Sequence, residues 1–286
     1  MKSRVLVQVI EGRHHPLLKK LRQMARSGEL LCEGEVLLET PKLVEEALSS
    51  GARISRVLVS QPAAQRVQEL VRRLSPPAKI YEVSRKLMES VAGTESQQGI
   101  LALASAPLWS IEDLFRKSPA LLVVLAGVQD PGNLGTVLRA AEAFGATGVV
   151  LLRGTVSLYN AKVVRATAGA LFRMPTLSGP TEAEAAQLLR QKHISLFACV
   201  AREAKQLEEA DLTGPVALAF GSEGRGLPQE LMAAGQAVSI PMAPAAESLN
   251  VAIAAAVALY EAARQRAGGE HVREKPERAG PSLRSG

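Results

Sequence analysis

Apolar residues recur along this chain with two different spacings. In residues 13–27, leucines and a methionine stand three or four positions apart between lysines and arginines, which predicts an amphipathic helix. Residues 54–59 and 121–125 are instead short runs rich in branched apolar residues, which predict strands. Because helical and strand-like segments alternate over most of the length, we expect an α/β protein with a parallel sheet.

The order of these segments predicts two folded parts. In residues 1–106 we expect helices over 13–27, 41–49, 62–74 and 84–91, and strands over 54–59, 79–83 and 99–104. In residues 119–267 we expect strands over 121–125, 148–152, 194–200, 216–220 and 237–240, helices over 134–144 and 160–171, a short helix from Pro228 and a last helix ending at Arg266. Residues 107–118 then form a linker, and residues 268–286, which lack an apolar period, form a disordered tail.

Positive charge is concentrated in the first part. The 286 residues carry a net charge of +6. Residues 1–106 hold 16 Lys and Arg against 11 Asp and Glu, whereas residues 119–266 hold 12 of each kind. A basic part joined to a neutral one suggests a polyanion-binding module and a module that carries chemistry. The alternative is a solvated basic face that binds no partner.

Several classes of protein are not expected. No apolar run reaches the ~20 residues that span a bilayer, and the start of the chain lacks the apolar core of a signal peptide, so we expect a cytoplasmic protein without membrane association. Cys32 and Cys199 lie far apart, which gives neither a disulfide framework nor a metal-type spacing. The four histidines are too scattered for a zinc site, so no metal is expected.

Three polar loops each follow an apolar strand in the second part, at residues 127–133, 221–227 and 241–250. Ligands of open α/β sheets bind outside the carboxyl ends of the strands, so we expect these loops to form one site. The first loop lacks the G-x-G-x-x-G spacing of a dinucleotide-binding turn, and the chain has no G-x-x-x-x-G-K-[ST] phosphate loop.

Each polar residue also has a plain structural interpretation. Asn133 can cap the helix that follows it, and Arg139 can form a surface ion pair with Glu142 three residues on. The glycines of 221–226 can form an ordinary tight turn. Ser248 can be the N-cap of the last helix, but this does not explain Asn250, a weak helix former, in the same turn.

Taken together, the three loops resemble the motifs of the SpoU/TrmH family of RNA ribose 2′-O-methyltransferases, in the SPOUT superfamily. The segments are DPGNLGTVLRAA at 130–141, FGSEGRGL at 220–227, and IPM at 240–242 with ESLNV at 247–251. The resemblance covers residues 119–266 and extends to the segment 162–171. Residues 1–106 are similar, more weakly, to the basic substrate-binding domain of rRNA-directed members.

The resemblance implies S-adenosylmethionine as methyl donor, a deep C-terminal trefoil knot around the donor, and a homodimer with each site near the dimer interface. By motif, the reactive centre comprises Asn133, Arg139, Glu223, Ser248 and Asn250, and the cofactor-binding backbone comprises Gly221, Ile240 and Leu249. One position departs from the family, because Pro244 stands where glycine is usual. Proline fixes φ and removes an N–H, so donor affinity is the property in question.

The function implied is methyl transfer from S-adenosylmethionine to a ribose 2′-hydroxyl of ribosomal RNA. The alternatives are the same reaction on transfer RNA, or a non-catalytic RNA-binding or ribosome-assembly factor that keeps the fold. A guanidinium stays protonated in proteins, so we expect Arg139 to act as a charged donor to the hydroxyl and a neighbouring phosphate rather than as a base. RNA binding by the first part should weaken as salt rises.

Overall fold

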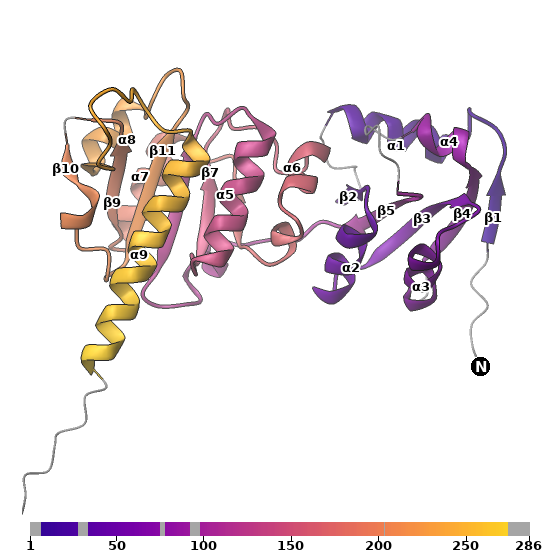
Figure 1. Cartoon of the computed structure of the whole chain (residues 1–286), viewed down its shortest axis with the longest axis horizontal. Coiled ribbons are helices and arrows are strands. Elements are labelled where there is room, and N and C mark those ends of the chain that lie inside the picture. Colours follow the sequence, from indigo (N-terminus) through magenta and orange to yellow (C-terminus); the bar gives the residue numbers. More distant parts are fainter. Residues whose placement is uncertain (1–6, 28–33, 75–77, 92–97, 203, 274–286) are drawn as a thin grey trace, which may run out of the picture.

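The computed structural model describes residues 7–27, 34–74, 78–91, 98–202 and 204–273. Two β-sheets, each with its own helices, follow one another along the chain and lie side by side (Figure 1). Among the described residues, no helix is long and apolar enough to cross a membrane. Of the tail predicted for 268–286, residues 268–273 continue the last helix, and the remainder lies outside the described residues.

The first sheet is mixed and has the order β1-β4-β3-β5-β2. Its strands are β1 (Val7–Ile10), β2 (Glu35–Leu38), β3 (Ile54–Gln61), β4 (Lys79–Ser84) and β5 (Ile100–Ser105). Strand β4 is parallel to β1 and β3, whereas β5 is antiparallel to β2 and β3. The helices are α1 (Pro16–Ser27), α2 (Pro41–Ser49), α3 (Gln65–Arg73) and α4 (Arg85–Glu89). The predicted apolar stripe of α1 is buried because it packs against one face of the sheet, and the branched residues of β3 are buried because β3 is the central strand.

The second sheet has seven strands in the order β10-β12-β9-β11-β6-β7-β8. They are β6 (Leu121–Ala126), β7 (Gly148–Leu151), β8 (Thr176–Ser178), β9 (Ser195–Val200), β10 (Lys205–Gln206), β11 (Val216–Gly221) and β12 (Gln236–Ser239). Every pairing in this sheet is parallel, which confirms the predicted parallel sheet. The helices are α5 (Pro131–Ala143), α6 (Ala161–Ala166), α7 (Glu182–Gln191), α8 (Gln229–Ala234) and α9 (Val251–Arg273), with 3-10 turns at Glu112–Phe115, Ala170–Phe172 and Leu207–Glu209.

Helices cover both faces of this sheet. Alternate residues of β6 belong to two different apolar cores: Leu121, Val123 and Leu125 pack with α5 and α9, whereas Leu122 and Val124 pack with α7 and α8. A strand buried on both faces has no polar alternation, which is why this segment is apolar throughout.

Three differences from the predicted elements have local causes. Helix α5 begins at Pro131, three residues early, because the Asp130 carboxylate accepts from the Asn133 backbone N–H at 2.8 Å and caps the helix. The helix predicted over 160–171 divides at Gly169, whose φ of 98° is left-handed. Strand β8 and helix α7 were not predicted, although Thr181 and Glu184 form a capping box that signals the start of α7.

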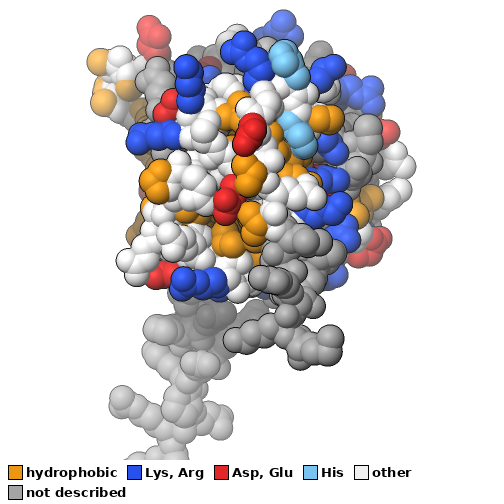
Figure 2. Space-filling model, turned by 90° about the vertical axis from the view of Figure 1, so that its right-hand side faces the viewer, with side chains coloured by type: hydrophobic (Ala, Val, Ile, Leu, Met, Phe, Trp, Pro, Cys, Tyr) orange, Lys and Arg blue, Asp and Glu red, His pale blue; other side chains and the backbone are white. Residues whose placement is uncertain are grey.

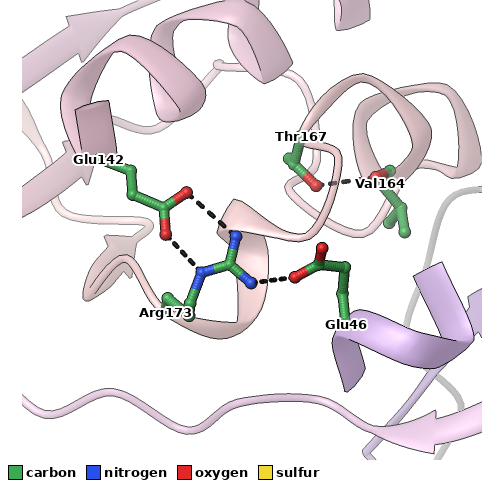
Figure 3. A network of polar contacts seen from close by, with 5 residues as sticks. All are labelled: Glu46, Glu142, Val164, Thr167 and Arg173. Atoms are coloured by element: carbon green, nitrogen blue, oxygen red, sulfur yellow. Dashed lines mark hydrogen bonds and ion pairs between the residues drawn. The ribbon is translucent and has the colours of Figure 1, made fainter. Parts of the chain in front are cut away.

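Charged side chains join the two sheets' domains (Figure 3). The Arg173 guanidinium binds Glu142 of α5 and also Glu46 of α2, so one cation bridges the two parts. Because Glu142 is engaged by Arg173, the predicted surface pair between Arg139 and Glu142 is wrong. A second pair joins the buried Glu39 to Arg165 of α6, and α6 packs against β2 and α1. These contacts hold the first domain against α6.

Candidate active site

Three side chains from three loops meet at the carboxyl edge of the second sheet. The Asn250 side-chain N–H donates to the Asn133 side-chain oxygen at 3.0 Å and to the Glu223 carboxylate at 3.0 Å. The Asn133 side-chain N–H donates to the same Glu223 oxygen at 3.1 Å. The convergence predicted for the three loops is therefore present, although the three residues are separated by 27 to 117 positions.

Helix capping fixes the orientation of Asn250. Its side-chain oxygen accepts from the backbone N–H groups of Ala252 at 2.9 Å and of Ile253 at 3.3 Å. Because the single side-chain oxygen of Asn250 is taken up by these two N–H groups, its side-chain nitrogen points the other way, toward Glu223. Asn250, and not Ser248, is therefore the N-cap of α9, and the capping interpretation of Ser248 is wrong. The capping interpretation of Asn133 is wrong as well, because Asn133 lies inside the first turn of α5 and Asp130 supplies the cap.

A cavity of about 230 Å³ opens beside this cluster. It lies over the carboxyl ends of β9, β11 and β12, and its walls include Phe220, Leu227, Ile240, Leu249 and Val251. The three residues predicted to bind the cofactor, Gly221, Ile240 and Leu249, all line it, and so do Glu223 and Ser248. The structure places these residues together, and their individual roles stay predictions.

Gly221 shows why the cavity needs glycine at its entrance. A Cβ at this position would lie 2.0 Å from the Gly226 carbonyl carbon and 2.4 Å from the Leu227 nitrogen. The loop closes on itself there, since Ser222 and Gly226 form a β-bridge and Gly226 has a φ of 66°. A closed loop of bare backbone beside apolar walls suits a ligand with an apolar ring and several hydrogen-bonding edges, as S-adenosylmethionine has.

The loop that carries Pro244 accommodates the proline. The Ala246 N–H donates to the Ala243 carbonyl at 3.0 Å, so Pro244 is the second residue of a tight turn, a position that suits its fixed φ and needs no N–H. Arg202 then holds the turn, because its guanidinium donates to the carbonyls of Pro244, at 2.9 Å, and of Ala246.

Sequence reasoning missed the contribution of β9. Cys199, Val200 and Ala201 line the cavity, and Arg202 follows them. The signal was available, because this segment also leaves the carboxyl end of a parallel strand, although it has no glycine or polar cluster. Burial raises the pKa of the Cys199 thiol to about 12, so Cys199 serves as an apolar wall at neutral pH.

Arg139 is the predicted site residue that the structure does not bring to the cluster. It is exposed on α5 and does not line the cavity beside the cluster. It forms no ion pair with any residue in the described part of the chain. Metal ligands are not assembled either, since no group of three or more His, Cys, Asp or Glu among the described residues could hold an ion.

Comparison with known proteins agrees with this geometry. The SpoU rRNA Methylase family matches residues 120–260, and the substrate-binding domain of RNA 2′-O ribose methyltransferases matches residues 41–109. An uncharacterized tRNA/rRNA methyltransferase of Synechocystis sp. is 34% identical over 90% of this chain and 93% of its own. The 23S rRNA (guanosine-2′-O-)-methyltransferase RlmB of Xanthomonas campestris is 35% identical over 72% of this chain and 85% of its own.

Solved structures give the same result. The SpoU methyltransferase AviRb of Streptomyces viridochromogenes, in complex with AdoMet, superimposes with a TM-score of 0.81 at 25% identity, over 88% of this chain and 98% of its own. The AdoMet-bound rRNA methyltransferase of Sinorhizobium meliloti gives 0.78 at 28% identity, over 90% of this chain and 98% of its own. The fold and site thus define an RNA methyltransferase that uses S-adenosylmethionine. The chain belongs to the SpoU rRNA methylase family.

Proposed function

We propose that this protein transfers a methyl group from S-adenosylmethionine to the 2′-hydroxyl of one ribose in ribosomal RNA. The observation that carries the proposal is the Asn133–Glu223–Asn250 cluster beside the 230 Å³ cavity, which Glu223 lines. The bound sulfonium supplies an electrophilic methyl carbon. The protein must therefore place the 2′-oxygen in line with that carbon and stabilise the charge as the hydroxyl loses its proton.

The cluster is suited to orientation. Glu223 accepts both amide N–H groups, and Asn250 is fixed by the helix it caps, so the three side chains form a rigid wall. Gly221, Ile240 and Leu249 hold the donor in the cavity through backbone groups, and Ser248 lines the same wall. The segments 221–227 and 241–250 cradle the donor within the trefoil knot that the sequence resemblance implies, and the cavity that both segments line supports this position for the donor.

The chemistry still needs a cation, and Arg139 supplies it in a homodimer. Arg139 is exposed on α5 and does not line the cavity beside its own cluster, so in this proposal it acts at the site of a second copy. An apolar stripe on α9 supports this arrangement: Ile253, Val257 and Tyr260 follow helical spacing and are 54%, 38% and 55% exposed. Tyr260 packs edge-on against Phe144, so the stripe is continuous with α5. Two copies that pair through α5 and α9 bury this stripe, and Arg139 of each copy then reaches the site of the other.

The first domain, residues 1–106, binds the RNA, the linker is 107–118, and residues 119–267 carry out the reaction. Figure 2 views the end of the first domain, where Lys and Arg side chains gather along the upper rim and one side. Where exposure is described, the exposed cations of its helices are Lys19, Lys42, Arg66, Arg72, Arg73, Arg85 and Lys86. Such cations bind RNA phosphates and recognise the shape of the RNA rather than its sequence. A protein that modifies ribosomal RNA acts where that RNA lies, so we infer a cytoplasmic location.

A methyl-transfer assay tests this function. The full-length protein is incubated with labelled S-adenosylmethionine and, separately, with unmodified 23S rRNA, 16S rRNA and bulk tRNA, and the label is mapped by mass spectrometry of nuclease fragments. We expect stoichiometric 2′-O-methylation at one rRNA ribose. Methylation of a tRNA ribose instead would transfer the function to tRNA. Donor binding without methylation of any RNA would favour a ribosome-assembly factor.

A further inference from the structure

A second and larger cavity, of about 640 Å³, adjoins the first. It lies over the carboxyl ends of β11, β6 and β7, so the two cavities have strand β11 in common. The two cavities share Ser222, Glu223, Gly226 and Val251, and Asn133 lines the second. The Asn133–Glu223 contact therefore stands at the boundary between two hollows, and a reaction that joins two substrates needs such a pair of adjoining subsites.

Two guanidiniums line this second cavity. Arg153 follows β7, and Arg225 lies in the 221–227 loop. Neither has an ion-pair partner within 4.0 Å among the residues that the structure describes. The pKa of Glu184 is lowered mainly by hydrogen bonds from Thr181 and only to a smaller extent by the charge of Arg153. Arg153 is thus near a carboxylate that a capping box already engages.

The carboxylates of the same cavity already accept hydrogen bonds or lie at a helix N-terminus, whereas its two guanidiniums have no ion-pair partner among the described residues. Asp130 accepts from the Asn133 backbone, and Glu223 accepts from two side-chain amides. Glu182 stands in the first turn of α7, where the helix dipole stabilises it. An anionic ligand would therefore meet two available guanidiniums, whose planar donors match phosphate oxygens.

We propose that the second cavity is the acceptor subsite, which takes the target ribonucleotide of the RNA and holds a phosphate of that nucleotide with Arg153 and Arg225. The assignment rests on the proposed function. The volume of the second cavity lies within the range of small-molecule sites. The Asn133–Glu223 contact lines this cavity, and the 2′-oxygen must face the donor there. Arg153 and Arg225 are binding residues in this scheme, and neither takes part in proton transfer.

Substitution of the two arginines tests the subsite in the full-length protein. We expect Arg153→Ala and Arg225→Ala each to raise the KM for 23S rRNA about tenfold, because a charge-assisted hydrogen bond is worth roughly one factor of ten or more. The kcat and the donor Kd should change less than about twofold, since the donor occupies the other cavity. Arg153→Lys should recover part of the loss. Arg190→Ala, which removes another exposed charge, from the last turn of α7, should change neither the KM nor the kcat.

The salt dependence of filter binding to 23S rRNA separates a phosphate contact from a structural effect. Each lost contact should lower the slope of log K against log salt by about 0.7 to 0.9. A variant with both Arg153→Ala and Arg225→Ala that still methylates the RNA with unchanged slope and unchanged KM would show that the second cavity is not the acceptor subsite. If the wild-type protein methylates no RNA but the slopes still fall in the variants, the proposed function fails and the phosphate contact stands.

Discussion

The side-chain N–H of Asn250 donates to the side-chain oxygen of Asn133 at 3.0 Å, although 117 positions separate them in the sequence. The contact joins the first turns of α9 and α5, the two helices that pack together on one face of the second sheet. Both helices begin immediately after loops from the carboxyl edge. Their N-terminal ends therefore present backbone donors and two amides toward the same point, next to Glu223.

Asn250→Asp separates the two tasks of this residue. The carboxylate still caps α9, so the free energy of unfolding should fall by less than about 1 kcal/mol. It cannot donate to Glu223, and two carboxylates then stand together, so kcat should fall about 10²-fold. Chemical denaturation and a steady-state rate assay measure the two effects, and a normal rate would exclude a role for the amide donor.

Arg139→Ala should lower kcat by about 10²-fold and leave donor affinity unchanged, because in the proposed dimer the guanidinium acts on the ribose hydroxyl and not on the donor. Mixing Arg139→Ala with Asn133→Ala tests action across the dimer. After subunit exchange, half of the dimers are mixed and each mixed dimer has one intact site, so about a quarter of the wild-type rate should return. If exchange is demonstrated and no activity returns, Arg139 does not serve the partner's site.

Gly221→Ala should abolish tight donor binding. Its Cβ would stand 2.0 Å from the Gly226 carbonyl carbon, so the loop must open. Gly224 is the matched control in the same loop, since a Cβ there meets nothing within 4 Å and its φ is not in the left-handed region. Isothermal titration with S-adenosylmethionine should show a loss of at least tenfold for Gly221→Ala and less than twofold for Gly224→Ala. Equal affinities would mean that the loop's closure is not needed to hold the donor.

Arg173→Ala should loosen the contact between the two domains. It leaves Glu46 and Glu142 without the cation that joins them, yet each of these side chains is partly exposed, so the loss of stability should be only about 1 kcal/mol. Cleavage within residues 107–111, which are not buried, by a low concentration of protease should become faster, and 1 M salt should produce a similar effect in the wild-type protein. Arg264→Ala breaks a pair within α9 and serves as control. Identical cleavage rates would show that the bridge does not restrain the domains.

The alternation of strands and helices was sufficient to predict the parallel second sheet, because a strand buried on both faces must be apolar throughout and a surface helix must be apolar on one side. The same rule failed for β8, whose three residues carry no period, and for β1. Sequence could also place the three loops at one edge, since the carboxyl ends of parallel strands share it.

Which side chains meet at that edge was decided only by tertiary structure. The sequence indicated Ser248 as the cap of α9 and allowed Glu142 to pair with Arg139. In the folded protein Asn250 caps α9 and Glu142 forms its ion pair with Arg173. The physical reason is distance: periodicity and capping depend on neighbours within about one turn, whereas a hydrogen bond between residues 117 apart depends on how the whole sheet brings two helix ends together.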